Sequence, residues 1–178
     1  WGDRDFPASE NGVEAGCQAI REGKTKYSAN AGILELRQAI ARYLHRAEGP
    51  SYDPASQIIV TAGAMEALFL ALKVLLEPGD EVIVNEPCWT NYIQQISMCG
   101  GIPVPVAADP QKGFDLDVEK IAQAVTPRTR VIILNSPCNP TGAVASREAL
   151  EQLAKLAEEH DLVVLADEVY KHILFDGL

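Results

Sequence analysis

The chain has 178 residues, of which 47% are hydrophobic and 22% are charged, and its formal net charge at pH 7 is −10. This composition is typical of a folded globular chain, and the length suits one domain or part of a larger one. The negative charge disfavours nucleic acid and anionic membrane as principal partners, although a local dipole can still attract a small anion.

The cysteines and the two ends of the chain indicate the class of protein. The four cysteines, Cys17, Cys88, Cys99 and Cys138, form no CxxC pair, which predicts reduced thiols, no metal site and a cytoplasmic protein. No apolar run approaches the roughly 20 residues that cross a bilayer, so we expect no membrane segment. The start lacks an initiator methionine and a signal core, and no closing helix ends the chain; we therefore expect a fragment.

Strands and helices are expected to alternate along the chain. After an irregular stretch over residues 1–32 with one short helix at 13–21, an amphipathic helix begins near Ile33 and ends near Gly49-Pro50. Short β-branched runs predict five strands, at 57–61, 81–84, 102–106, 131–134 and 162–166. Helices are expected between them, at 65–76, at 90–98, from Asp115 or Asp117 through Val125, and from a Ser146 cap through His160.

This alternation predicts βαβ units and a mainly parallel sheet in a three-layer αβα architecture, so the fold class is α/β. We expect residues 1–32 to lead into a domain that spans 33–178. Pro103 and Pro105 exclude the strand at 102–106 from the centre of the sheet and predict an edge. The helix at 65–76 is apolar on nearly every side, which predicts burial against the sheet and against a second surface, for which another subunit is a candidate.

The stretch from Val131 to Gly142 is the most informative. Four apolar residues predict a strand buried on both faces, and the loop that follows contains Asn135, Asn139 and Pro140, which cannot continue a ladder. Open α/β sheets bind ligands at the carboxyl ends of their strands. An ordinary strand-to-helix turn is the alternative interpretation.

Other strand ends carry residues that suit the same kind of ligand. Gly63 and Ala64 open a helix whose free N–H groups would suit a phosphate, and Trp89 offers a flat surface for an aromatic ring. The strand at 162–166 runs into Asp167 and Tyr170. Each of these residues has a structural explanation of its own, as a turn, core or cap residue. Together they predict a pocket for a phosphorylated aromatic ring.

These residues also carry a family resemblance. The chain resembles the large domain of class I/II pyridoxal-phosphate-dependent aminotransferases of the aspartate aminotransferase type, which have fold type I. The matching motifs cover essentially the whole chain in the family's order: Gly2-Asp3-Arg4-Asp5-Phe6-Pro7, Tyr27 through Gly32, Leu36-Arg37, Ala62-Gly63-Ala64-Met65-Glu66-Ala67, Glu86-Pro87-Cys88-Trp89, Asn135-Ser136-Pro137-Cys138-Asn139-Pro140-Thr141-Gly142 and Ala166-Asp167-Glu168-Val169-Tyr170.

The resemblance implies a cofactor, pyridoxal 5'-phosphate, and a role for each matching residue. Backbone N–H groups of Gly63 and Ala64 would bind its phosphate, Trp89 would stack on its ring, and Asp167 would pair with the ring nitrogen. Asn139 and Tyr170 would hydrogen-bond the ring's phenolic oxygen. Tyr27 would contact the phosphate of the cofactor that is bound in the partner subunit of a homodimer. Gly2 and Asn139 would lie near the substrate.

The chain departs from the family's pattern in two places. Many relatives have a Ser or Thr hydroxyl beside the glycine that matches Gly63, whereas this chain has Ala62 and Ala64. The lysine that forms the Schiff base follows well after the tyrosine in this family, so no catalytic residue is expected in this fragment; Lys171 is too close to Asp167 to take that role. Two strands of the family's seven-stranded sheet, which separate the first strand from the others, are also missing.

The implied function is that of the parent protein: transfer of an amino group between an amino acid and a 2-oxo acid. The same pocket would serve a pyridoxal-phosphate-dependent C–S lyase or synthase of the same fold. A third possibility is the aminotransferase-like ligand-sensing domain of a transcription regulator. We expect the fragment alone to be inactive.

Overall fold

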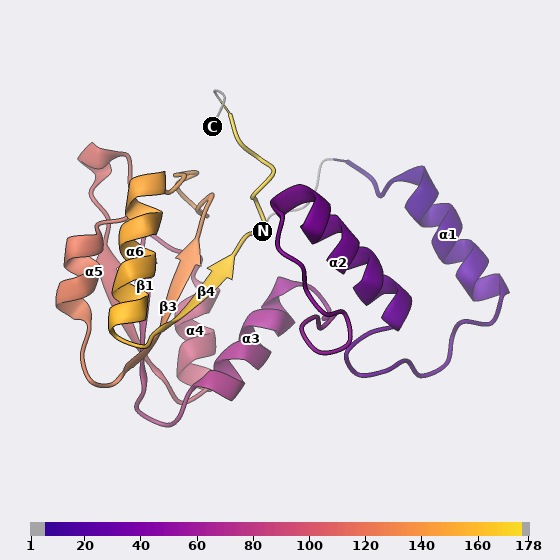
Figure 1. Cartoon of the computed structure of the whole chain (residues 1–178), viewed down its shortest axis with the longest axis horizontal. Helices are drawn as coiled ribbons and strands as arrows, with labels where there is room; N and C mark the ends of the chain where they lie inside the picture. The colour runs from indigo at the N-terminus through magenta and orange to yellow at the C-terminus, as the bar shows by residue number, and fades with distance from the viewer. Residues whose placement is uncertain (1–5, 176–178) are drawn as a thin grey trace. The chain divides into compact units, whose positions relative to one another are not determined.

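The structure is a computed structural model that describes residues 6–175. The chain forms two compact units, Trp1–Thr61 and Ala62–Leu178 (Figure 1). This division falls later than the boundary that the sequence predicts after residue 32, and that boundary stays a prediction.

The first unit contains two helices, α1 (Glu10–Arg21) and α2 (Leu34–Glu48). α1 begins three residues before the expected start because the Ser9 hydroxyl accepts a hydrogen bond from the N–H of Gly12 and caps the helix. α2 ends at Gly49, whose φ of 97° favours glycine. The guanidinium of Arg37 donates to the carbonyl oxygens of Gly32, Pro54 and Ala55, which holds the loop after α2 against the helix.

The prediction of a strand at 57–61 is wrong. In the structure this segment is irregular, and the N–H of Val60 donates to the carbonyl of Ala31 at 3.0 Å instead of joining a ladder. A β-branched run favours extended backbone, but a strand needs a neighbouring strand to pair its N–H and C=O groups. No described residue supplies that neighbour.

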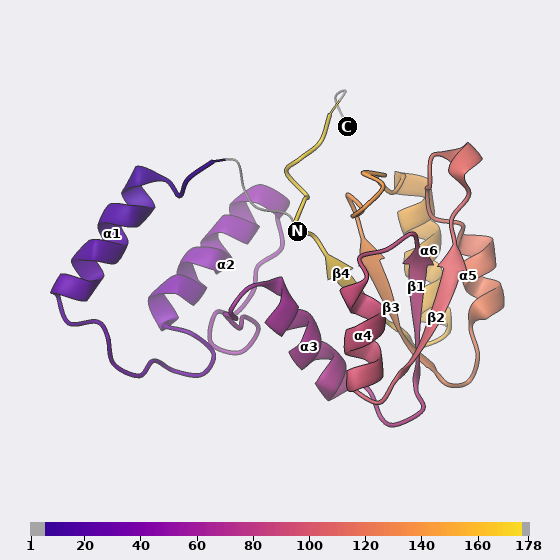
Figure 2. The ribbon, with the colours of Figure 1, turned by 180° about the vertical axis from the view of Figure 1, so that it is seen from behind.

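The second unit is built on a parallel sheet of β1 (Glu81–Glu86), β2 (Ile102–Ala107), β3 (Thr129–Asn135) and β4 (Val163–Asp167). Its strand order is β2-β1-β3-β4, and every pair is parallel. The predicted edge position of the segment with Pro103 and Pro105 is confirmed, since β2 lies at one end (Figure 2). The register sets Asn135 opposite Asp167, so two polar residues meet where β3 and β4 end.

Helices cover both faces of the sheet, which confirms the three-layer α/β architecture (Figures 1 and 2). α3 (Ala64–Leu75) and α4 (Asn91–Met98) lie on one face, and α5 (Val118–Ala124) and α6 (Arg147–Glu159) lie on the other. A short 3₁₀ turn, η1 (Pro110–Lys112), follows β2. The predicted caps are present: the side chain of Asp117 accepts from the N–H of Lys120, and that of Ser146 accepts from the N–H of Ala149.

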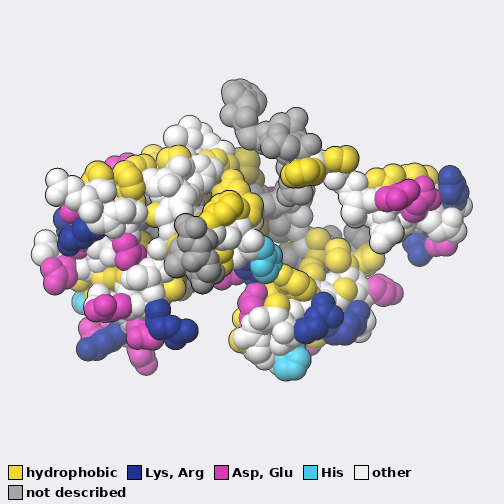
Figure 3. All heavy atoms as spheres, turned by 90° about the horizontal axis from the view of Figure 1, so that it is seen from above, with side chains coloured by type: hydrophobic (Ala, Val, Ile, Leu, Met, Phe, Trp, Pro, Cys, Tyr) yellow, Lys and Arg dark blue, Asp and Glu magenta, His cyan; other side chains and the backbone are white. Residues whose placement is uncertain are grey.

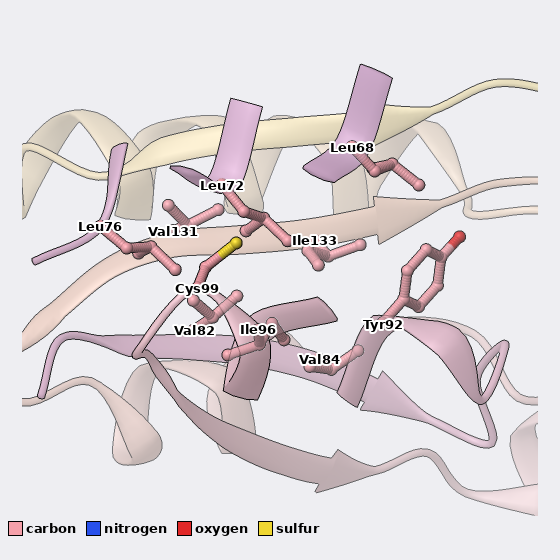
Figure 4. Close-up of a cluster of buried hydrophobic side chains, with 10 residues drawn as sticks. All are labelled: Leu68, Leu72, Leu76, Val82, Val84, Tyr92, Ile96, Cys99, Val131 and Ile133. Atoms are coloured by element: carbon pink, nitrogen blue, oxygen red, sulfur yellow. The ribbon is translucent and has the colours of Figure 1, made fainter. Parts of the chain in front are cut away.

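Successive core side chains along each strand point to opposite faces of the sheet. Val82 and Val84 point toward α3 and α4, while Ile83 between them packs on the opposite side. A strand that is buried on both faces needs apolar residues at every position, which explains the continuous apolar runs in the sequence. Figure 4 shows the cluster under α3 and α4, whose members are Leu68, Leu72, Leu76, Val82, Val84, Tyr92, Ile96, Cys99, Val131 and Ile133.

The described part of the second unit buries α3 on one side only. Leu68 and Leu72 pack into the core, whereas Leu70 is 44% exposed and Val74 is 85% exposed. The second surface that the apolar sequence predicted is therefore not supplied by the described part of the second unit.

The charged surface carries no large patch of one sign on the face shown in Figure 3, where acidic and basic side chains alternate. None of the helices within residues 6–175 combines the length and the apolar character that a bilayer crossing requires.

We expect Leu72→Ala to lower the free energy of unfolding by about 2–5 kcal/mol, because it leaves a cavity in a fully buried site. The control on the same helix is Lys73→Ala, which should change that free energy by less than about 0.5 kcal/mol because the side chain is exposed. Urea denaturation measures both. Equal losses for the two variants would contradict the assignment of the buried face of α3.

A buried carboxylate, Glu81, lies at the amino end of β1 and is held by two exposed partners. Glu81 is 5% exposed; its Oε2 accepts from the Thr126 hydroxyl at 2.5 Å, and its Oε1 accepts from Nε of Arg128 at 2.9 Å. These two contacts, the first of them the larger, hold the pKa of Glu81 below its ordinary value of 4.5.

A carboxyl whose pKa is lowered on folding stabilises the protein above its unfolded pKa, and that stabilisation is lost as the pH falls through the folded pKa. We therefore expect the unfolding free energy of the wild type to fall more steeply below pH 4.5 than that of Glu81→Gln, which cannot titrate. Denaturation midpoints measured between neutral and acidic pH provide the comparison. Parallel pH profiles for the two proteins would refute the role of Glu81.

Candidate functional site

A buried tyrosine and an aspartate meet at the carboxyl edge of the sheet. Asp167 is the last residue of β4, and its Oδ2 accepts a hydrogen bond of 2.6 Å from the hydroxyl of Tyr92 on α4. The N–H of Val169 donates to Oδ1 at 3.2 Å. Tyr92 is 1% exposed, and its burial, followed by the hydrogen bond to Asp167 and that residue's charge, raises the pKa of the phenol. Tyr92 therefore remains protonated at neutral pH and stays a donor to the carboxylate.

An asparagine joins the end of β4 to the loop that follows β3. The Asn135 amide donates from Nδ2 to the backbone carbonyl of Asp167 at 3.0 Å. Its Oδ1 accepts from the backbone N–H of Asn139 at 2.8 Å. Asn135 thus uses both ends of its amide, and it fixes the position of Asn139 relative to Asp167.

Trp89 lies directly before α4 and contacts Tyr92 edge to face. The two ring centroids are 5.4 Å apart and the ring planes are inclined by 81°, a favourable arrangement for aromatic rings. Because the indole also packs against the core under α4, its orientation is fixed from two sides. Trp89 and Asp167 are therefore both held by the same buried tyrosine.

The first turn of α3 begins at a glycine N-cap. Gly63 is the N-cap residue with a φ of 79°, and the structure gives the cap no side-chain hydrogen bond. α4 holds this turn in place, since the Gln95 amide donates to the carbonyl of Met65 at 3.1 Å and Asn91 contacts the Met65 sulfur. The N-terminus of a helix attracts anions through its free N–H groups and its dipole.

These groups fit a phosphorylated aromatic ring with a basic ring nitrogen. A fixed carboxylate suits a protonated nitrogen, an indole suits the ring face, and a helix N-terminus suits the phosphate. α4 connects all three, because it carries Tyr92 and Gln95 and follows Trp89. In residues 6–175, no group of three or more His, Cys, Asp or Glu side chains is arranged to hold a metal ion.

The contacts described above do not include the remaining residues of the predicted site. Tyr170 is in the turn after β4 and is 36% exposed, and its backbone carbonyl accepts from Ile173. Tyr27 belongs to the first unit, where its side chain is fully exposed. Gly2 lies outside the described residues.

Tyr92 was not among the predicted site residues, although one sequence feature points to it. It follows Trp89 by three positions at the start of an expected helix, a spacing that places both side chains on the same face. No sequence feature indicates the contacts of Gln95 and Asn135, because each contact is made to a residue that is distant in the sequence.

Tyr92→Phe should lower the free energy of unfolding by about 1.5–3 kcal/mol, the range for a hydrogen bond to a charged group. Tyr52→Phe removes the same hydroxyl from an exposed ring and should change the free energy of unfolding by less than about 0.5 kcal/mol. Thermal or urea denaturation measures both, and a Tyr92→Phe variant as stable as wild type would refute the contact with Asp167.

The chain matches known proteins over its whole length. The family model "Aminotransferase class I and II" matches residues 2–178. The aspartate/prephenate aminotransferase of Thermus thermophilus is 46% identical over 176 residues, which are 99% of this chain and 46% of that protein. The aromatic-amino-acid aminotransferase 2 of Thermococcus litoralis is 39% identical over 99% of this chain and 46% of its own length.

Solved structures agree with the sequence matches. The aspartate aminotransferase from Thermus thermophilus with maleate superposes with a TM-score of 0.95 at 46% identity, covering 99% of this chain and 46% of that one. The N-succinyldiaminopimelate aminotransferase from Mycobacterium tuberculosis gives a TM-score of 0.97 at 41% identity, covering 100% and 47%. The chain spans about half the length of the curated relatives it matches. With sequence and structure in agreement, the chain belongs to the class I and II aminotransferase family.

Proposed function

We propose that the protein to which this chain belongs is a pyridoxal-phosphate-dependent aminotransferase that moves an amino group between an amino acid and a 2-oxo acid. The observation that carries the proposal is the Asp167 carboxylate, held by the buried Tyr92 hydroxyl next to Trp89. Proteins named as aspartate, prephenate and aromatic-amino-acid aminotransferases match nearly the whole chain, which favours amino-group transfer over the lyase and sensor alternatives.

Each residue of the site would contact a particular part of this cofactor. Asp167 would hold the proton on the pyridine nitrogen, Trp89 would lie on the ring face, and the Gly63 and Ala64 amides would bind the phosphate. Asn139 and Tyr170 would hydrogen-bond the phenolic oxygen, and Gly2 and Asn139 would border the substrate. When bound, pyridoxal phosphate supplies an electron sink for negative charge at the substrate's α-carbon.

Asp167 acts through electrostatics. Its carboxylate keeps a positive charge on the ring nitrogen, and this charge increases the ring's capacity to accept electrons. Tyr92 and the N–H of Val169 each donate to one carboxylate oxygen, so the group is oriented before any ligand binds. A preorganised charge of this kind costs no reorganisation at the moment of reaction.

The phosphate site depends on backbone donors. Ala62 and Ala64 carry no hydroxyl, and the Glu66 carboxylate accepts from the N–H of Ala62, one of the donors in this turn. The amides of Gly63 and Ala64 are the ones we assign to the phosphate. A homodimer would add Tyr27 from the partner subunit, and its fully exposed side chain in this chain is consistent with that role.

The exposed side of α3 also supports a homodimer. Leu70 and Val74 present apolar surface on a helix whose other side is in the core. All four cysteines are free thiols, as is usual in a reducing compartment, and we assign the protein to the cytoplasm.

The covalent anchor for the cofactor is not among the residues of this site. The ammonium of Lys171 lies 3.1 Å from the Glu168 carboxylate in the turn after β4, where it forms an ion pair. We therefore expect this chain alone to show no transaminase turnover, and we place the anchoring lysine in the half of the relatives' length that the chain does not span.

Added pyridoxal phosphate should give the full-length protein a visible absorption band. In the same protein, Asp167→Ala should lower kcat by at least about a hundredfold, which is the effect of removing a preorganised electrostatic partner. The control is Glu158→Ala, which removes a carboxylate from the exposed side of α6 and should leave kcat unchanged. Wild-type turnover in Asp167→Ala would refute the assignment to the ring nitrogen, and a full-length protein without the band would refute the cofactor.

Product analysis separates transfer from elimination. An aminotransferase should form one new amino acid for each 2-oxo acid it produces, and turnover should stop when the acceptor is omitted. Release of ammonia or sulfide without an acceptor would support a lyase instead, and cofactor binding with no turnover would support a ligand sensor.

A further inference from the structure

We propose that Cys88 and Cys138 are a thiol pair that forms a reversible disulfide between the two loops carrying Trp89 and Asn139. Its oxidant is a low-molecular-weight disulfide such as glutathione disulfide. The bridge itself is independent of the function proposed above, whereas its effect on cofactor binding rests on that function.

The topology brings the two cysteines together. β1 and β3 are parallel neighbours in the sheet, and each continues into a loop in which a cysteine follows a proline. The sulfur of Cys138 lies 3.5 Å from the carbonyl oxygen of Pro87, and that carbonyl is bonded directly to the nitrogen of Cys88. A disulfide requires Cα atoms roughly 4.4–6.8 Å apart, and the Cys138 sulfur already lies beside the peptide group that contains the Cys88 nitrogen.

The other two cysteines are poorly placed for this reaction. Cys99 is 4% exposed under α4, with its thiol directed at the carbonyl of Phe69, whereas Cys88 and Cys138 are only partly buried. Cys17 belongs to the first compact unit. A small disulfide reagent can therefore reach Cys88 and Cys138 without unfolding the core.

The surroundings of the two thiols set the order of attack. Burial raises the pKa of Cys88 to about 11, and the nearby Glu86 carboxylate and Cys138 add to the effect. Thiolates rather than thiols attack disulfides, so Cys88 is a weak first nucleophile and the reaction begins at Cys138.

The exchange is balanced in two steps. The Cys138 thiolate attacks one sulfur of the reagent, which breaks the reagent's S–S bond, releases one thiolate and leaves a mixed disulfide. Cys88 then gives up its proton to solvent and attacks the Cys138 sulfur, which displaces the second thiolate. Two protein thiols are oxidised to one disulfide, and one small disulfide is reduced to two thiols.

The bridge would alter the ring-binding loops. Its formation takes the Cys138 sulfur from the Pro87 carbonyl to a covalent distance from the Cys88 sulfur and draws the two loops together. Trp89 and Asn139 are the next residues in each loop, and Asn139 is held by its N–H bond to Asn135. The oxidised form should therefore present the ring plane and the ring amide in a changed geometry.

The test treats the full-length protein, free of cofactor, with glutathione disulfide and maps its peptides by mass spectrometry. We expect a linkage between the peptides containing Cys88 and Cys138 that dithiothreitol reverses. Cys88→Ser and Cys138→Ser should each abolish it, while the control Cys17→Ser should retain it. A wild-type protein with only a stable glutathione adduct, or with either cysteine bridged elsewhere, would overturn the proposal.

Cofactor titration of the oxidised and reduced forms measures the consequence. The oxidised wild type should bind pyridoxal phosphate at least about tenfold more weakly, a change of about 1.4 kcal/mol, and Cys138→Ser should bind equally before and after the treatment. Equal affinities in the two wild-type forms would refute the effect on the site. A protein that forms the bridge but never binds the cofactor would refute the proposed function and leave the thiol pair standing.

Discussion

The hydrogen bond between Tyr92 and Asp167 joins two residues 75 positions apart and organises the carboxyl edge of the sheet. It places a buried phenol from α4 against the carboxylate that ends β4, and the same phenol ring supports Trp89. One turn further along α4, Gln95 holds the first turn of α3. A helix of eight residues thus positions a carboxylate, an aromatic plane and the N-terminal turn of α3 relative to one another. Tyr92 and Gln95 are 1% and 5% exposed, and close packing restricts the rotation of buried side chains.

Much of this architecture follows from local sequence patterns. Val131 through Leu134 must be buried on both faces, Pro103 and Pro105 must lie at an edge, and Ser146 must cap a helix; the structure confirms all three. Asp167 and Asn139 could be expected at the site because the carboxyl ends of parallel strands share one edge. The contacts that fix them could not, since the pairing of Asn135 with Asp167 depends on strand register, and periodicity does not determine register between distant segments. The prediction of a strand at 57–61 was wrong for a related reason. β-branched residues favour an extended backbone, but an extended segment forms a strand only when a neighbouring strand pairs with it.

The proposed phosphate site lies in a negatively charged protein. The formal net charge is −10, whereas the N-terminus of α3 is a local positive pole. The Glu66 carboxylate close to that pole accepts from the N–H of Ala62, and we assign the phosphate to the amides of Gly63 and Ala64. The two partly buried cysteines lie on the loops that carry the ring contacts, so the same strand ends that would bind the cofactor also bring two thiols together. A change at either loop is transmitted to Trp89 or Asn139 through the backbone alone.

We propose that Asp167, oriented by Tyr92, binds the ring nitrogen of pyridoxal phosphate. A crystal structure of the full-length protein soaked with the cofactor is the sharpest test. We expect the ring nitrogen within about 2.6–3.0 Å of an Asp167 carboxylate oxygen, as in charge-assisted hydrogen bonds, with the Trp89 ring stacked on the pyridine face. A cofactor bound with its ring nitrogen away from Asp167, or with Tyr92 no longer in contact with that carboxylate, would refute this assignment.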